Sequence, residues 1–194
     1  GRLLSDAGIT LDMSGGDIAN QNGLITAKGP LTFNRLRDLN NQSGEVSSSQ
    51  SFSLSGRNVD NTSGKLISSN LLGLNAIGLI NQNGLISGWQ GLTVSGSSLD
   101  NRNSGTLSSR NGNFGLTLRG ALLNSNNGAL VSQQALSVTA ASLDNSGGIL
   151  SSGAGQALTV SGLLNNGQHG LIDSGAALIV QAMTLGNEIG RAHV

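Results

Sequence analysis

The sequence predicts an all-β protein, a parallel β-solenoid of about nine turns with about 20 residues in each turn. Three observations favour this fold. A short motif returns nine times between Ile18 and Asn187, apolar residues alternate in short runs at the same period, and Gly, Asn and Ser separate these runs. Such a chain can bury its apolar side chains only by stacking each repeat on the next one.

The repeated motif is an apolar residue, a variable residue and an Asn, followed three to five residues later by a Gly. Successive Asn residues lie 20 to 23 positions apart. In a stack of parallel strands, equivalent side chains lie above one another, so a column of Asn can form a ladder of amide hydrogen bonds. We expect this structural ladder to consist of Asn20, Asn41, Asn61, Asn81, Asn101, Asn124, Asn145, Asn165 and Asn187.

Two apolar columns follow the same period and should fill the interior. The first column follows the Gly and contains Ile25, Val46, Leu66, Ile86, Leu107, Leu130, Leu150 and Ile172. The second is a pair of apolar residues separated by one residue, and this alternation places both on one face of a strand. Its members are Leu31/Phe33, Phe52/Leu54, Leu72/Leu74, Leu92/Val94, Leu116/Leu118, Leu136/Val138, Leu158/Val160 and Leu178/Val180.

The variable residue of the motif should point outward, and this includes Leu164 in the eighth repeat. Asp60, Asp100 and Asp144 share this position and alternate with apolar residues. They would lie two strand spacings, or about 10 Å, apart on the outer face. This separation is too large for a shared calcium ion and for the carboxylate pair of a glycosidase. We therefore expect solvated surface charges at these positions.

The composition argues against several functional classes. A formal net charge of zero and a charged fraction of 10% leave no dense basic patch for nucleic acid. No apolar run is long enough for a membrane span, and the absence of Cys leaves no Cys-based metal site. His169 and His193 fall at different positions of the repeat and are expected at the surface. We predict no catalytic residue, no cofactor and no metal site.

Trp89 is the only Trp of the chain and lies in a Gly-containing corner. It is a candidate binding contact if it is exposed, and otherwise it covers a corner of the core. The longest interval, from Asn101 to Asn124, should hold its additional residues in the turn-like segment from Ser109 to Gly115.

The domain organisation predicted is one solenoid segment over residues 1–194. It begins with a partial turn at 1–17, continues with repeats at 18–187 and ends with a partial turn at 188–194. No capping element is recognisable in the sequence at either end, although open strand edges are usually protected. We therefore expect a segment of a larger protein.

Two segments of the chain resemble haemagglutinin repeats: they read VDNTSGKLISS at 59–69 and LDNSGGILSS at 143–152. Such repeats belong to the filamentous haemagglutinin family of bacterial exoproteins, which are exported by two-partner secretion. The resemblance covers essentially the whole chain. It implies a right-handed β-helix shaft, secreted to the surface of a Gram-negative cell, with an outer-membrane transporter as its partner during export. It transfers no catalytic residue, because the repeat carries none.

The family includes adhesins, haemagglutinins and the stick-like effectors of contact-dependent growth inhibition. The first hypothesis is therefore a structural shaft that presents distal binding regions to a receptor or glycan on a host or neighbouring cell. The alternative is the stick region of a growth-inhibition effector that delivers a toxin. A polysaccharide-cleaving β-helix enzyme is least favoured, because the carboxylates are too far apart. Neither nucleic-acid binding nor membrane insertion of this segment is expected.

Overall fold

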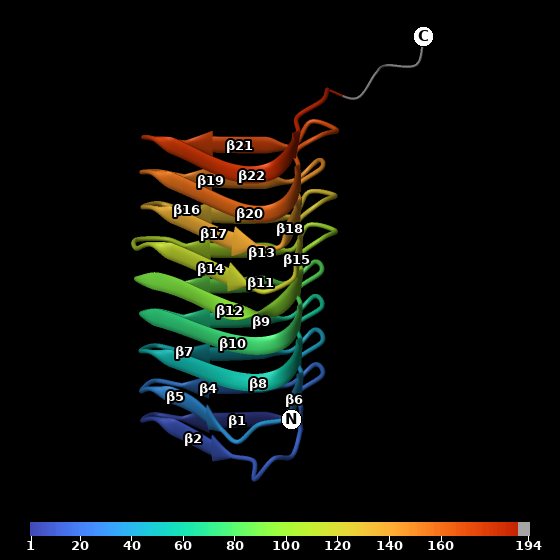
Figure 1. Ribbon diagram of the computed structural model, residues 1–194. Coiled ribbons are helices and arrows are strands. Elements are labelled where there is room, and N and C mark those ends of the chain that lie inside the picture. Colours follow the sequence, from blue (N-terminus) through green and yellow to red (C-terminus); the bar gives the residue numbers. More distant parts are fainter. Residues whose placement is uncertain (190–194) are drawn as a thin grey trace.

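The protein is a parallel β-solenoid, as the repeat predicts. The computed structural model describes residues 1–189, and within that range it contains strands and turns but no helix. The strands stack along one axis from the N-terminal turn to the last described turn (Figure 1). All the strand pairs are parallel, and each strand pairs with its equivalent one turn away.

A nine-stranded sheet forms one side of the solenoid. Its members are β1 (Arg2–Ser5), β4 (Leu24–Ala27), β7 (Glu45–Ser48), β9 (Lys65–Ser68), β11 (Leu85–Gly88), β13 (Thr106–Ser109), β16 (Ala129–Ser132), β19 (Ile149–Ser152) and β21 (Leu171–Ser174). Each strand has four residues, and from β4 to β19 the side chains alternate between partly or fully exposed and buried positions. This alternation matches the period of two in the sequence.

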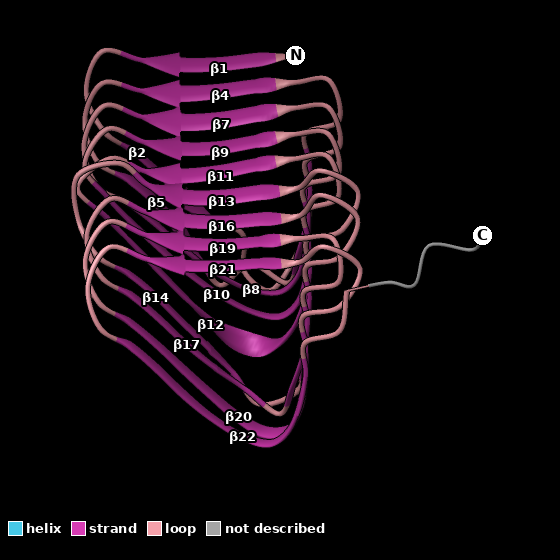
Figure 2. Cartoon of the chain, turned by 90° about the horizontal axis from the view of Figure 1, so that it is seen from above, coloured by secondary structure: helices cyan, strands magenta, loops and turns pink. Residues whose placement is uncertain are grey.

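A 13-stranded sheet bends around the other two sides, which gives the three-sided outline in Figure 2. Its members are β2 (Ile9–Asp12), β3 (Ile18–Ala19), β5 (Leu31–Asn34), β6 (Asp38–Asn40), β8 (Phe52–Asp60), β10 (Leu71–Ile80), β12 (Gly91–Asp100), β14 (Phe114–Leu118), β15 (Ala121–Leu123), β17 (Leu136–Ala140), β18 (Ser142–Asp144), β20 (Gln156–Asn165) and β22 (Leu178–Gly186). In some turns one long strand follows the bend, and in others two short strands replace it. Each turn therefore presents three faces.

The interior consists of apolar columns that run along the axis. In the column that follows the motif Gly, the side chains from Ile25 to Leu150 are at most 2% exposed. Val46, for example, pairs with Ile25 on one side and with Leu66 on the other. The only aromatic contact in the described range joins Phe33 and Phe52, whose ring centroids lie 5.7 Å apart. The core is thus almost wholly aliphatic, and it is built by neighbouring turns packing on one another.

The register of the alternating pair differs from the prediction in two turns. Phe114 and Leu116 pair with Leu92 and Val94, so the inward pair of this turn is Phe114/Leu116, not Leu116/Leu118. Two turns later the equivalent pair is Gln156/Leu158, not Leu158/Val160. Leu118 and Val160 are also buried, but they lie two residues further along their strands. A pattern of period two is unchanged by a shift of two residues, so the apolar pattern alone could not choose between these registers.

The additional residues of the longest turn are distributed over three corners, which corrects the expected single insertion. Gly105 follows Asn101 by four positions, whereas Gly84 follows Asn81 by three positions in the turn before. One further residue lies between Ser109 and Phe114, and another lies between Phe114 and Leu122, as the pairings with β11 and β12 show. Each corner accommodates one residue, and the strands between them remain in register.

Candidate functional site

A ladder of Asn side chains runs along one corner of the solenoid. The Nδ2 of each Asn donates to the Oδ1 of the Asn one turn later, over distances of 2.7–2.9 Å. The ladder consists of Asn20, Asn41, Asn61, Asn81, Asn101, Asn124, Asn145, Asn166 and Asn187. The six members from Asn41 to Asn145 are fully buried. Because a buried amide must find partners, the column binds each turn to the next.

The prediction that Asn165 belongs to the ladder is wrong, because Asn166 occupies that position. In β20, Asn165 pairs with Asp144 on the outer face and donates from Nδ2 to Asp144 Oδ1 at 3.1 Å. Leu164 is fully buried, so the prediction that it points outward is also wrong. The local sequence Leu164-Asn165-Asn166 repeats the pattern Leu39-Asn40-Asn41. That match favours Asn166 as the ladder residue, whereas Leu163-Leu164-Asn165 matches Leu122-Leu123-Asn124 and favours Asn165, so the sequence alone fits both.

The Gly of the motif makes room for the ladder. A Cβ atom on Gly64 would lie 2.2 Å from the backbone oxygen of Asn41 and 2.6 Å from Oδ1 of Asn61. The preceding residue, Ser63, has a φ of 56°, in the left-handed region that turns the chain sharply. The motif therefore requires Gly because the backbone of one turn approaches the Asn of the previous turn closely.

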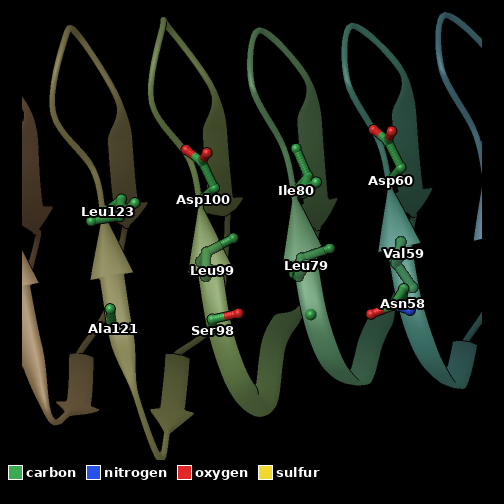
Figure 3. A pocket seen from close by; sticks show the side chains of 11 residues that line it. Asn58, Val59, Asp60, Leu79, Ile80, Ser98, Leu99, Asp100, Ala121 and Leu123 are labelled. Carbon is green, nitrogen blue, oxygen red and sulfur yellow. The ribbon is translucent and has the colours of Figure 1, made fainter.

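A shallow groove of about 290 Å³ lies on the outer face of β8, β10, β12 and β15. Figure 3 shows the carboxylates of Asp60 and Asp100 on either side of Ile80, in one row across the strands. A second row of small or polar residues forms the other wall: Asn58, Gly78, Ser98 and Ala121. Ile80 is 40% exposed. The groove therefore combines an apolar centre with two acidic positions.

Both carboxylates of the groove are held in the ionised state by hydrogen bonds. Partial burial raises the pKa of Asp60, but the hydroxyl and amide of Thr62 and the amide of Gln42 outweigh it, and the pKa lies below its ordinary value. Partial burial likewise raises the pKa of Asp100, and hydrogen bonds from Arg102 and Gln82 outweigh it, so this pKa is also lowered. A glycosidase needs one carboxylic acid that stays protonated. Neither group fits that role.

The acidic residues of this face do not gather into a metal site. Asp60, Asp100 and Asp144 lie in every second turn, so about 10 Å separates neighbours. Asp144 accepts hydrogen bonds from the hydroxyl of Ser146 and from the side-chain amide of Asn165. Within residues 1–189, no three His, Cys, Asp or Glu side chains lie together in a way that could hold a metal ion.

Comparison with known protein families identifies the repeat. The haemagglutinin repeat model matches residues 1–35, 26–87, 78–114 and 111–187, and so covers nearly the whole chain. The chain belongs to the haemagglutinin repeat family. Neither the curated proteins nor the solved structures yield a match to it. In this haemagglutinin repeat chain the motif residues have a structural role: the Asn side chains form the ladder, and the Gly leaves space for it.

The only Trp of this haemagglutinin repeat chain lies on the surface. Trp89 is 49% exposed, and the guanidinium of Arg110 lies 5.8 Å from its ring centroid. Its backbone is fixed by hydrogen bonds to the neighbouring turns, to Ser68 O at 3.0 Å and from Asn111 N at 2.7 Å. An adjacent hollow of about 430 Å³ is lined by Leu71, Leu72, Gly73, Gln90, Gly91, Leu92, Thr93 and Asn113. The corner therefore offers an indole, a cation and amide groups to solvent.

Of the two His residues, His169 lies in the part of the chain that the structure describes. His169 is exposed in the turn between β20 and β21, with a φ of 65°. His193 lies outside the described residues. Residues 1–189 also contain no helix that is long and apolar enough to cross a membrane.

Proposed function

We propose that this chain is a shaft segment of a large exported surface adhesin or haemagglutinin, and that it holds distal binding regions away from the cell. The observation that carries this proposal is the ladder that runs unbroken from Asn20 to Asn187. Every turn is bonded to the next by a buried amide and by two parallel sheets. About nine strand spacings give a rod of roughly 40 Å.

The outer surface supports a structural role rather than a catalytic one. The two carboxylates of the main groove have lowered pKa values and are engaged by neighbouring side chains. Ile80 separates Asp60 from Asp100, and Leu123 separates Asp100 from Asp144. Proton donation and metal binding both require a different arrangement. We therefore infer that the segment acts through its length and stiffness.

Membership of the haemagglutinin repeat family supports export by two-partner secretion through an outer-membrane transporter. A solenoid forms by adding one turn to the previous one, so it can fold progressively as a chain emerges. The absence of Cys means that no disulfide has to form during this process. The same properties would serve the stick region of a growth-inhibition effector, which a toxin domain elsewhere in the protein would distinguish from an adhesin.

The shaft proposal is tested by deleting whole turns. Removing residues 61–100 joins Asp60 to Asn101 and preserves the ladder, the sheets and the interior columns. This variant should remain folded and become shorter by two strand spacings, about 10 Å, in small-angle X-ray scattering. Removing residues 61–90 instead interrupts a turn and should lower the melting temperature strongly. If both deletions behave alike, the turns are not the interchangeable units that a shaft requires.

The Trp89 corner favours a second function, direct contact with a receptor or glycan on a host or neighbouring cell. Exposed Trp and Arg side chains are common at the energetic centres of interfaces. Binding of the purified chain to host and bacterial cells tests this function. Saturable binding that is lost in Trp89→Ala and Arg110→Ala, but kept in the distant control Asp173→Ala, would establish the contact. Absence of saturable binding would leave the shaft as the sole role of this segment.

A further inference from the structure

Five Asn residues of the chain are followed directly by Gly: Asn22, Asn83, Asn111, Asn127 and Asn166. An Asn-Gly pair is chemically special because Gly has no side chain to shield its backbone nitrogen. That nitrogen can attack the side-chain amide carbon of the preceding Asn. A hydrogen bond from the Gly nitrogen to another acceptor in the folded structure hinders this attack.

In four of the five pairs the Gly nitrogen is a hydrogen-bond donor. Gly23 donates to Asn20 O at 3.0 Å and Gly84 donates to Asn81 O at 3.1 Å. Gly128 donates to Ser125 O at 3.3 Å, and Gly167 donates to Asn165 Oδ1 at 3.1 Å. These bonds belong to the repeated motif turn beside the Asn ladder. At these four positions the Gly nitrogen is therefore engaged in a hydrogen bond within the motif turn.

Asn111-Gly112 lies at a different corner, between β13 and β14. This yellow-green loop extends further out than the equivalent corners of neighbouring turns (Figures 1 and 2). Asn111 is exposed, and among residues 1–189 no acceptor is bonded to the Gly112 nitrogen. The Gly112 carbonyl, in contrast, accepts from the hydroxyls of Ser109 at 2.8 Å and Ser132 at 3.0 Å.

Packing also requires Gly at position 112. A Cβ atom there would lie 1.9 Å from the backbone oxygen of Gln90 and 2.5 Å from its carbonyl carbon. No side chain fits at that distance, so the tight stacking of this corner on Trp89-Gln90-Gly91 demands the residue that makes Asn111 reactive. The fold thus requires the Gly of this pair.

We propose that Asn111 is a site of spontaneous deamidation in the folded protein. The Gly112 nitrogen forms a bond to Cγ of Asn111, loses its proton and expels ammonia, which leaves a cyclic imide. Water then opens the ring at one of its two carbonyls and yields aspartate or isoaspartate. One water is consumed and one ammonia is released, with no change of oxidation state. The new carboxylate lies next to Arg110 in sequence, beside Trp89, and the formal net charge changes from zero to −1.

Peptide mass spectrometry tests this proposal on the purified chain. The protein is incubated at mildly alkaline pH, and digestion is carried out in ¹⁸O-labelled water so that deamidation during digestion is recognised by its label. Trypsin cleaves after Arg110 and Arg119 and isolates Asn111 from the other Asn-Gly pairs. We expect Asn111 to react at least about fivefold faster than Asn83, because the latter must first lose a hydrogen bond.

Two controls make the result specific to the fold. In urea, where all five pairs lose their folded environment, Asn111 and Asn83 should react at similar rates. An Asn111→Gln variant should lose the rapid phase in the folded state. Equal deamidation rates of Asn111 and Asn83 in the folded protein would overturn the proposal. Faster deamidation of Asn83 than of Asn111 would overturn it as well.

Discussion

The side-chain amide of Asn61 donates to Oδ1 of Asn81 at 2.7 Å, and both residues are completely inaccessible to solvent. Asn81 in turn donates to Oδ1 of Asn101 at 2.8 Å and lies 3.1 Å from the backbone oxygen of Thr106. One side chain thus joins three consecutive turns. A buried polar group left without a partner costs more free energy than the hydrogen bond contributed, because the group cannot form a hydrogen bond with water instead.

Replacement of Asn81 by Ala should therefore reduce the free energy of unfolding by about 1–3 kcal/mol, through the partners left unsatisfied on both sides. Asp100→Ala is the matched control from the next turn, since its carboxylate lies on the outer face, and it should cost less than Asn81→Ala. Denaturant unfolding followed by circular dichroism measures both values. A larger loss for Asp100→Ala would contradict the roles assigned to the ladder and the outer face.

Gly64 and Gly73 make a second matched pair. A Cβ on Gly64 meets the backbone of Asn41 at 2.2 Å, whereas nothing lies within 4 Å of a Cβ on Gly73. Gly64→Ala should therefore destabilise the protein severely or prevent folding. Gly73→Ala should be neutral or stabilising by up to about 1 kcal/mol, because Gly is unfavourable within a strand. Melting temperatures compare the two directly, and similar values would show that the turn can relax away from the ladder.

Gln156 is a weak position in the core. It lies in the interior column between Leu136 and Leu178, is 2% exposed, and neither polar atom of its side chain has a hydrogen-bond partner in the described structure. Gln156→Leu would continue the column and remove two unsatisfied groups. We expect a stability gain of about 1–3 kcal/mol. The exposed Gln133→Leu serves as control and should change stability by less than about 0.5 kcal/mol.

Stability should fall in acid. The pKa of Asp60 and of Asp100 is lowered in the folded state, where hydrogen bonds outweigh the opposing effect of partial burial. A carboxyl whose folded pKa lies below its unfolded value stabilises the protein above the unfolded pKa. That contribution disappears as the pH falls through the folded pKa, in the range below about pH 4. Melting temperatures recorded from neutral pH downward should therefore decrease in that range.

The Asp60→Asn/Asp100→Asn double variant should show a shallower decrease, because the two contributions are missing at every pH. Exposed ion pairs between neighbouring turns, such as Asp12–Arg35 and Asp38–Arg57, act in the same direction. Salt screens such pairs, so recording both curves at high ionic strength reduces their share of the decrease, together with that of the Asp100–Arg102 pair. Identical pH curves for the two proteins would contradict this assignment.

Much of the fold follows from the sequence because a solenoid repeats its constraints. The column from Ile25 to Leu150 and eight of the nine ladder residues could be recognised from spacing alone. The groove could not, because it depends on which outward residues become neighbours across strands: Gly78 lies between Asn58 and Ser98, and Ala121 follows Ser98 in the same row. The free nitrogen of Gly112 was likewise invisible, since all five Asn-Gly pairs read alike.

The sequence by itself determined that this chain coils with a period of about 20 residues and which type of side chain fills each column, because equivalent positions of successive turns must satisfy one another. Only the tertiary structure decided the register within a turn. The choice of Asn166 over Asn165, and of Gln156 as an inward residue, depends on pairing with the preceding strands. A pattern of period two is unchanged by the two-residue shift that brings Gln156 inward. The doubled residues Leu163-Leu164 and Asn165-Asn166 let the motif begin at either Leu until a neighbouring strand is in place.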